Sequence, residues 1–342
     1  MKLMIYGANG YTGKLVAQQA QQRGLKPVLA GRNGEAIHKL AAQLEMPSCV
    51  VNLNDSAALQ QALQDIDVVI HCAGPFEVTA KSMIEACLAS HTHYVDITGE
   101  LSVFEYAHAQ HERAVQAGIV LCPGVGFDVI PTDCVAAKLK QKLPDATHLA
   151  LGFDSASRMS RGTAKTSVRR LGEGGAVRTD GTITPVPLAY KTRTINFGNG
   201  DKLAMTIPWG DVSTAYYTTG IPNIEVYIPA SPKLVSKLKK LNWFRWLLRF
   251  EGVKKFLEKK VEQQPAGPSD KQLEQATTYV WGEARNAAGV TETMRIQVLN
   301  GYKLTSIGAL DVALHIGAQT GVSGYYTPAL LCGNELVERY YV

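Results

Sequence analysis

Residues 1–15 read MKLMIYGANGYTGKL, and this stretch decides the fold of the chain. An apolar run at 2–6 is followed by closely spaced glycines and then by an amphipathic helical pattern that ends at Gly24. This order predicts a strand, a tight turn and a helix. Glycines in such a turn let a pyrophosphate approach the backbone, and the helix N-terminus offers free N–H groups to the phosphates. The alternative is a glycine-rich turn that binds nothing. We predict a dinucleotide site at Gly7, Asn9, Gly10, Tyr11, Thr12 and Gly13.

The end of the second strand, predicted at 27–30, decides between the two nicotinamide cofactors. An acidic side chain at this point bonds the ribose 2'-OH of NAD, whereas an arginine pairs with the 2'-phosphate of NADP. Arg32 and Asn33 stand here, and no acidic residue occurs before Glu35. NADP(H) is therefore the predicted cofactor, the alternative being that Arg32 is a solvated surface residue.

Further strands are predicted at 48–53, 67–73, 93–97 and 119–122, separated by helical patterns at 35–44, 78–89 and 101–117. Alternating strands and helices predict an α/β fold of the Rossmann type, with a doubly wound parallel sheet. Asp55 is expected to cap the helix that starts at Ser56. Glycine and polar residues recur at the strand ends, where such a sheet binds ligands. The predicted cofactor residues there are Cys72, Ala73, Gly74, Pro75, Phe76, Thr98, Gly99 and Gly126, with Glu100, Gly124 and Asp128 beside them.

Five segments together resemble the saccharopine dehydrogenase-like NADP-binding oxidoreductases, including the trans-acting enoyl reductase branch. They are GANGYTG (7–13), CAGPF (72–76), YVDITGE (94–100), PGVGFDVIPTD (123–133) and TPALLCGNELVER (327–339). The resemblance implies a Rossmann domain made of residues 1–130 plus 303–342. It also implies an inserted α+β substrate or dimerisation domain at 131–302.

In that second region a helix is predicted at 131–143, a strand at 147–153 and a helix at 163–171 with Thr163 as its N-cap. Family members often carry a Ser-Gly-Gly-Thr-Ala turn here, and this chain instead reads SRGTAK from 160 to 165. A basic group at a helix N-terminus can seat a substrate carboxylate or phosphate, and it can equally be a solvated helix face. The group consists of Arg158, Arg161, Lys165, Arg169 and Arg170.

Later strands are predicted at 182–186, 202–207 and 224–228, with a closing hairpin of 279–283 and 292–299. Residues 209–211 and 215–217 are expected in loops. These strands suit one mainly antiparallel sheet. Such a sheet either covers a cofactor cleft or pairs with its copy in a homodimer.

Residues 231–264 carry most of the charge and an unusual aromatic pattern. The whole chain of 342 residues has a net charge of +5, but Lys233 to Lys260 contain ten Lys/Arg and two acidic residues. This segment carries +8 and the remainder −3, which argues against a general nucleic-acid-binding surface. Its apolar positions fit a basic amphipathic helix. It lies on an anionic membrane surface, grips a lipidic acyl chain, or buries its aromatic face on its own domain or a second subunit, as most apolar helical stripes do.

The cysteines and histidines give no sign of a metal site. Six cysteines are scattered without a CxxC pair, which is typical of reduced thiols in the cytoplasm. His91 and His93 lie near Cys87 but lack an obvious third ligand, so we expect structural roles for them. No charged and apolar leader precedes the first strand, and no apolar run reaches the roughly 18 residues of a membrane span. We therefore expect a cytoplasmic protein.

Hydride transfer needs no nucleophile, but it needs a protein that binds NADPH, excludes water and delivers a proton. Candidate proton donors are Tyr94, Asp128, Asp133 and Lys165, each of which also fits a structural role. We predict Asp128 and Lys165 as catalytic. The expected function is an NADP(H)-dependent oxidoreductase that reduces a C=N or C=C bond in a small or lipid-linked substrate. The alternatives are a non-catalytic NADP-binding sensor or scaffold and a membrane-surface adaptor.

Overall fold

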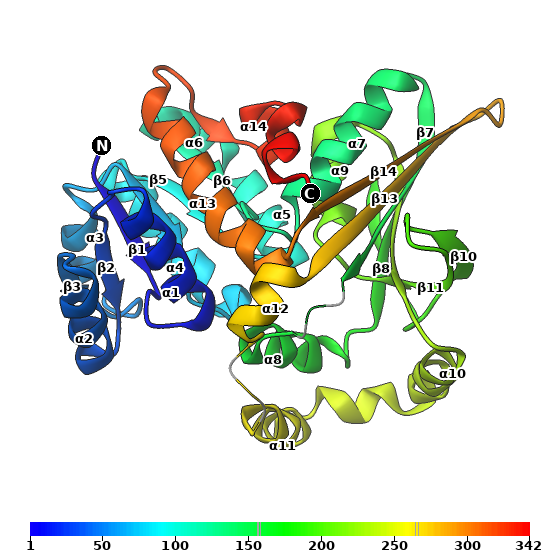
Figure 1. Cartoon of the computed structure of the whole chain (residues 1–342), viewed down its shortest axis with the longest axis horizontal. Coiled ribbons are helices and arrows are strands. Elements are labelled where there is room, and N and C mark those ends of the chain that lie inside the picture. Colours follow the sequence, from blue (N-terminus) through cyan, green and yellow to red (C-terminus); the bar gives the residue numbers. More distant parts are fainter. Residues whose placement is uncertain (156, 158, 264, 266) are drawn as a thin grey trace. The chain divides into compact units, whose positions relative to one another are not determined.

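In a computed structural model the described residues, 1–155, 157, 159–263, 265 and 267–342, form two compact units (Figure 1). The first unit is Met1–Ile130 with Tyr302–Gly333, and the second is Pro131–Gly301 with Asn334–Val342. Arg158 of the basic group lies outside the described residues.

The last residues of the chain depart from the expected division, which assigned all of 303–342 to the first domain. Residues 334–342 belong to the second unit. Tyr341 forms a β-bridge with Val298, and the backbone N–H of Val342 donates to the carbonyl of Gln297 at 3.2 Å. These backbone pairings explain the correction, since an exposed strand edge provides partners that a sequence pattern does not reveal.

The first unit is built on a seven-stranded parallel sheet, which confirms the predicted Rossmann-type fold. The strand order is β15-β6-β5-β4-β1-β2-β3. The central strands are buried and mostly apolar because helices cover both faces of a doubly wound sheet. The bounds are β1 (Leu3–Tyr6), β2 (Val28–Gly31), β3 (Ser48–Val50), β4 (Val68–His71), β5 (His93–Asp96), β6 (Val120–Cys122) and β15 (Gly324–Tyr325).

The helices predicted at 35–44 and 78–89 are present, whereas the long helix at Gly301–Ala318 was not predicted. The helix expected over 101–117 is divided at Gln110, whose backbone leaves the helical region at φ −94° and ψ 7°. Asp55 caps α3 as predicted, accepting from the N–H of Ala58 at 3.0 Å. The helices are α1 (Tyr11–Gln22), α2 (Gly34–Leu44), α3 (Ser56–Leu63), α4 (Phe76–Ser90), α5 (Leu101–Ala109), α6 (His111–Ala117), α13 (Gly301–Ala318) and α14 (Pro328–Cys332).

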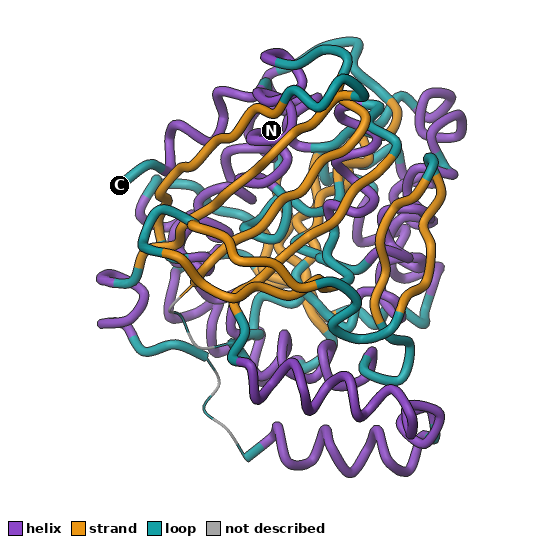
Figure 2. The backbone as a smooth tube through the Cα atoms, turned by 90° about the vertical axis from the view of Figure 1, so that its right-hand side faces the viewer, coloured by secondary structure: helices purple, strands orange, loops and turns teal. Residues whose placement is uncertain are grey.

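The second unit contains an eight-stranded sheet whose long strands lie side by side in Figure 2. The order is β10-β11-β12-β7-β13-β14, with β8 paired to β12 and β9 to β8. Pairing is antiparallel except between β7 and β12. The bounds are β7 (Ala146–Ser155), β8 (Gly175–Thr179), β9 (Thr182–Val186), β10 (Thr192–Asn196), β11 (Asp201–Ile207), β12 (Asn223–Pro229), β13 (Thr277–Asn286) and β14 (Thr291–Leu299).

Two expectations for the helices of the second unit were wrong. Residues 211–219 form a helix rather than loops, because burial of Val212 and Ala215 outweighs the weak helix propensity of this Ser/Thr/Tyr-rich stretch. Ser160, not Thr163, caps α8, accepting from the N–H of Thr163 at 3.3 Å. The helices are α7 (Ile130–Lys142), α8 (Arg161–Arg170), α9 (Asp211–Thr219), α10 (Pro232–Leu241), the 3-10 helix η1 (Asn242–Arg249), α11 (Glu251–Glu262), α12 (Asp270–Gln275) and the 3-10 helix η2 (Asn334–Tyr340).

Among the described parts of the chain, none of the helices is long and apolar enough to cross a bilayer.

Candidate functional site

The glycine turn between β1 and α1 is packed so closely that two of its positions exclude any side chain. Gly7 has φ +81°, and a Cβ at this residue would lie 2.8 Å from the backbone nitrogen of Ala73. A Cβ at Gly13 would collide with the carbonyl oxygen of Gly7. The turn is closed by the N–H of Gly10, which donates to that same carbonyl at 2.9 Å. The backbone is thus bare and rigid where a pyrophosphate would approach it.

The helix that follows this turn starts without a side-chain cap. Gly10 is the N-cap of α1 and has no side chain to offer. The N–H groups of the first turn of a helix have no partner inside the helix, and together with its dipole they form an anion site. Tyr11 packs edge-on against Tyr302 with ring centroids 5.3 Å apart, and Thr12 is half-buried. The predicted residues around the turn are therefore gathered at one helix start.

Arg32 lies at the end of β2, exposed to solvent. Burial raises the pKa of the Tyr6 phenol, and the nearby positive charge of Arg32 opposes this increase. The neighbouring Asn33 has a structural role, because its side-chain oxygen accepts from the N–H of Ala36 at 3.1 Å and caps α2. Asn9 is close to the same strand end, since a Cβ at Gly31 would lie 3.2 Å from its Oδ1. Arg32 therefore follows directly on a residue that lies beside the glycine turn.

The segment after β4 is braced by the side chain of Thr79, which donates to the carbonyl of Ala73 at 2.6 Å. Phe76 packs edge-on against the buried ring of His71, with centroids 5.4 Å apart. Burial lowers the pKa of His71 to about 3, so this imidazole is neutral at pH 7. Burial and the charge of Asp96 raise the pKa of Cys72 to about 12. The thiol therefore stays protonated and is a poor nucleophile.

Asp96, at the end of β5, is completely buried and accepts three hydrogen bonds. The donors are the Tyr94 hydroxyl at 2.5 Å, the Thr98 N–H at 3.0 Å and the Gly124 N–H at 2.8 Å. Burial raises the pKa of Asp96 to about 6, and these hydrogen bonds limit the increase. The carboxylate ties the loop after β5 to the loop after β6.

Glu100, expected beside the nicotinamide, instead caps a helix. Its Oε1 accepts from the N–H of Phe76 at 3.0 Å, and its Oε2 accepts from the N–H of Glu77 at 2.6 Å. These are the first N–H groups of α4, where a negative charge is stabilised. The N–H of Glu100 donates to the Thr98 hydroxyl at 3.1 Å, so Thr98 braces the same loop.

Asp128 differs from the other two carboxylates. Its Oδ2 lies so close to Gly99 that a Cβ there would be 2.7 Å away, yet among the described residues its side chain receives no hydrogen bond. Burial, and secondly the charge of Glu100, raise its pKa to about 7. The loop is fixed by the N–H of Phe127, which donates to Thr305 Oγ1 at 2.9 Å. A half-buried carboxyl that titrates near neutral pH suits general acid–base chemistry.

The other predicted proton donors have structural partners. Lys165 belongs to α8 in the second unit, where its ammonium is 2.7 Å from Glu262 of α11. Asp133 accepts from the Thr218 hydroxyl at 2.5 Å. Two further cations of α8 are paired as well, Arg169 with Glu258 at 2.8 Å and Arg170 with Glu173 at 3.2 Å. The structure thus gathers the cofactor residues and Asp128 in the first unit, and uses Lys165 to join two helices of the second.

The two histidines near Cys87 each contact a backbone group. His91 Nδ1 lies 2.9 Å from the carbonyl of Ala117, and His93 Nδ1 accepts from the N–H of Val120 at 2.8 Å. Within the described ranges, His, Cys, Asp and Glu side chains form no cluster of three or more that could hold a metal ion.

The strand order, the glycine turn and the uncapped helix start define the first unit as a dinucleotide-binding Rossmann domain. Residues 3–122 match the family model of the saccharopine dehydrogenase NADP binding domain. The resemblance and the predicted cofactor, NADP(H), are both confirmed by this match.

Relatives with similar sequences carry related names. The chain is 29% identical over 151 residues to a mouse saccharopine dehydrogenase-like oxidoreductase, a match that covers 38% of the chain and 35% of the relative. It is 28% identical over 140 residues to a trans-acting enoyl reductase of Mycobacterium ulcerans, covering 39% and 34%. The chain therefore matches about a third of the length of these relatives.

The fold of the whole chain is similar to that of a solved saccharopine dehydrogenase (L-Glu forming) from Saccharomyces cerevisiae. The TM-score is 0.65 at 12% identity, and the match covers 99% of this chain and 96% of the other. Both units therefore share a fold with that enzyme.

Proposed function

We propose that the protein is an NADP(H)-dependent oxidoreductase that reduces a C=N or C=C bond in a small or lipid-linked substrate. The observation that carries this proposal is Asp128, a half-buried carboxyl with a pKa of about 7 at the ligand-binding end of a Rossmann sheet. Among the three carboxylates there, Asp96 and Glu100 are held by N–H or O–H donors, and Asp128 has its oxygens available for a ligand.

The residues around the glycine turn fit the cofactor. The bare backbone at Gly7 and Gly13 leaves room for a pyrophosphate, and the start of α1 provides N–H donors. Arg32, after β2, would pair with the 2'-phosphate. The loops at 72–76 and 98–99, with Gly126, would hold the nicotinamide half. When bound, NADPH supplies the hydride, so the protein itself has to supply orientation and a proton.

Asp128 is the proposed proton donor. In its neutral form it gives a proton to the substrate atom that becomes more basic as the double bond is reduced. Its raised pKa keeps a substantial fraction of it protonated near pH 7. A side chain at position 99 would crowd the Oδ2 atom of Asp128, and Gly99 has none.

Turnover is tested by following NADPH absorbance with imino acids, enoyl thioesters and quinones as substrates. NADPH consumption that depends on an imino acid or an enoyl thioester supports the proposal and identifies the bond type, whereas consumption with quinones alone would reject the proposed bond type. Tight NADPH binding without consumption for any class would reject it.

The cofactor assignment is tested separately by Arg32→Glu. Exchanging the cation for a carboxylate should weaken NADPH binding by about 10- to 100-fold, because a charge-assisted contact is replaced by repulsion. NADH binding, which involves no 2'-phosphate, should change much less. Lys39→Glu, an exposed charge reversal on α2, is the matched control. An unchanged preference for NADPH over NADH in Arg32→Glu would contradict the assignment.

The ion pair of Lys165 with Glu262 favours a second candidate, a non-catalytic NADP-binding sensor or scaffold. Only one of the two predicted catalytic residues is then left to act on a substrate. This candidate predicts NADPH binding without turnover. It also predicts that Asp128 can be replaced without functional loss.

The partners and location proposed with this function follow from the same residues. We propose a cytoplasmic protein with a small-molecule substrate, because its six cysteines are free thiols. Arg161 at the start of α8 supports a substrate with a carboxylate or phosphate. The large second sheet supports a homodimer, which sedimentation equilibrium would test.

A further inference from the structure

The segment Pro232–Glu262, formed by α10, η1 and α11, is attached to the second unit at both ends (Figure 1). Helix α10 buries Val235 in a small cluster with Met205, and Leu238 packs against it. Helix α11 buries Val261 and is joined to α8 by the Lys165–Glu262 and Arg169–Glu258 ion pairs. The intervening η1 is therefore held in place from both sides.

Within this segment, η1 turns its polar side chains towards the protein. The side chain of Asn242 makes two hydrogen bonds with the backbone of Leu188, accepting from the N–H at 2.9 Å and donating to the carbonyl at 3.1 Å. Arg249 Nε donates to the carbonyl of Gly172 at 3.2 Å. An ordinary surface helix has the opposite orientation, with its apolar side inward.

The aromatic side chains of the segment consequently face away from the protein. Trp243 is 83% exposed, Phe244 61%, Trp246 58% and Phe250 56%, and η1 has no buried residue. Phe256 on α11 is also 58% exposed. Isolated exposed apolar residues are common, but five exposed aromatic side chains in one segment mark an interaction surface.

Lysines flank this aromatic group without acidic partners. Lys233, Lys237, Lys239 and Lys240 of α10 form no ion pair with any residue in the described ranges. Together with the other cations of the stretch they give residues 233–260 a charge of +8, whereas the rest of the chain is negative. The surface is therefore both aromatic and strongly cationic.

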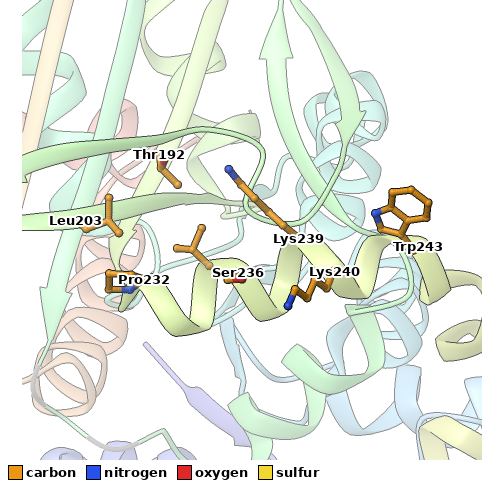
Figure 3. A pocket seen from close by; sticks show the side chains of 8 residues that line it. Thr192, Leu203, Pro232, Ser236, Lys239, Lys240 and Trp243 are labelled. Carbon is orange, nitrogen blue, oxygen red and sulfur yellow. The ribbon is translucent and has the colours of Figure 1, made fainter.

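A groove of about 410 Å³ lies beside α10 (Figure 3). Its lining combines an apolar floor of Leu203 and Val235 with the hydroxyls of Thr192 and Ser236 and the side chains of Lys239 and Trp243. Hydroxyl and ammonium donors next to an apolar floor suit a phosphate group attached to a hydrocarbon chain.

We propose that Pro232–Glu262 docks on the surface of a bilayer that contains anionic phospholipid. The aromatic rings of η1 enter the head-group region, where tryptophan and phenylalanine are favoured. The lysines of α10 lie over the lipid phosphates, one of which occupies the groove. Charge complementarity selects this occupant: a second copy would bring a charge of +8 against another +8, whereas the lipid supplies the opposite charge.

The direct test measures binding of the purified full chain to vesicles by co-sedimentation. Vesicles of phosphatidylcholine mixed with phosphatidylglycerol should bind the protein, and vesicles of phosphatidylcholine alone should bind it at least about 10-fold less. Binding should weaken as salt rises. Because Trp243 and Trp246 are exposed and Trp281 is buried, tryptophan fluorescence should shift to shorter wavelength on binding. Equal binding to both vesicle types, or to neither, would overturn the proposal.

Two variants separate insertion of the aromatic rings into the bilayer from electrostatic attraction of the lysines to it. Trp243→Ser combined with Trp246→Ser should remove the fluorescence shift and reduce binding about 10-fold or more. Lys237→Glu combined with Lys240→Glu should reduce binding at least as strongly. Lys142→Glu combined with Lys271→Glu makes the same charge change at exposed sites outside the segment and should retain most of the binding. Equal losses of vesicle binding in the two lysine-pair variants would overturn the proposal that binding is local to this segment.

Self-association is the competing use of the same rings, and sedimentation equilibrium without lipid measures it. A monomer, or a dimer that the tryptophan variant leaves intact, agrees with lipid docking. A dimer that dissociates in the tryptophan variant, together with a wild-type protein that ignores anionic vesicles, would assign the surface to a second copy instead. Unchanged melting temperatures in all variants would show that the fold is intact.

Discussion

Hydrogen bonds to the backbone hold polar side chains both at the end of the first sheet and in the 3-10 helix η1. In the first region these side chains are buried, and in the second their neighbours are exposed. In the first unit, Asp96 and Glu100 are buried and take backbone N–H groups as donors. In η1, Asn242 is also bonded to the backbone, but the residue after it, Trp243, is left almost fully exposed. In both regions the bonded polar groups fix the geometry. The side chains of Asp128 in the first region and Trp243 in the second take no part in these hydrogen bonds and are available to another molecule.

Of the substitutions that test this comparison, replacing Asp128 by asparagine should have the largest effect, which is on the rate of reduction. Loss of a general acid typically costs about 100- to 10,000-fold in rate, and NADPH binding should be retained. In the wild-type enzyme, kcat/KM for reduction should fall as the pH rises through about 7, because the acid form is lost. The amide of the Asp128→Asn variant cannot titrate, so its residual rate should lack this step; steady-state kinetics across pH measures both. A wild-type rate in this variant would show that the carboxylate is not a catalytic residue.

Gly13→Ala should lower the free energy of unfolding by about 2–4 kcal/mol, because the new methyl group in the glycine turn collides with the carbonyl of Gly7. Denaturant unfolding measures the loss. Gly34→Ala is the control, since a Cβ there would meet Val50 Cγ2 at an ordinary 3.5 Å. Equal stability of the two variants would contradict the close packing of α1 on the turn.

Asp96→Asn should cost about 2–3 kcal/mol of unfolding free energy, because an amide cannot accept from all three donors and turns an N–H group towards one of them. Asp55→Asn offers a matched comparison, since Asn caps a helix as well as Asp does and the change should stay within about 0.5 kcal/mol. Chemical denaturation of both variants decides whether Asp96 holds the two loops together.

Asn242→Ala should lower the free energy of unfolding by about 1 kcal/mol, from loss of two hydrogen bonds with Leu188. Trp243→Ser should change the stability by less than about 0.5 kcal/mol, because the ring is exposed. Thermal melting compares them. A greater loss for the tryptophan than for the asparagine would mean that the ring is packed within the chain, and the contrast between the two regions would disappear.

Local patterns predicted much of the first unit. The strand–turn–helix start at Gly7 and Gly13 depends on neighbouring residues, so its chemistry is visible in the sequence. The same holds for the position of Arg32 after β2 and for the cap at Asp55. The doubly wound parallel sheet also followed from the alternation of elements, because parallel strands connected by helices have few arrangements.

Roles set by distant partners could not be predicted. Glu100 caps a helix that starts 24 residues earlier, and Lys165 meets Glu262 across 97 residues. The helix at Asp211–Thr219 depends on burial rather than propensity. The orientation of η1 is likewise set by Leu188 and Gly172, so periodicity identified an amphipathic segment but could not say which side faces outward.

The short strand β15 has a consequence for how the protein is made. Gly324 and Tyr326 donate to the carbonyls of Ile119 and Leu121, so the edge of β6 is completed by a strand about 200 residues further along the chain. At typical rates of synthesis, roughly 10–40 s pass on the ribosome between these two strands. During this interval the β6 edge is open to other nascent chains or to chaperones, and a chain cut short before Gly324 keeps it open.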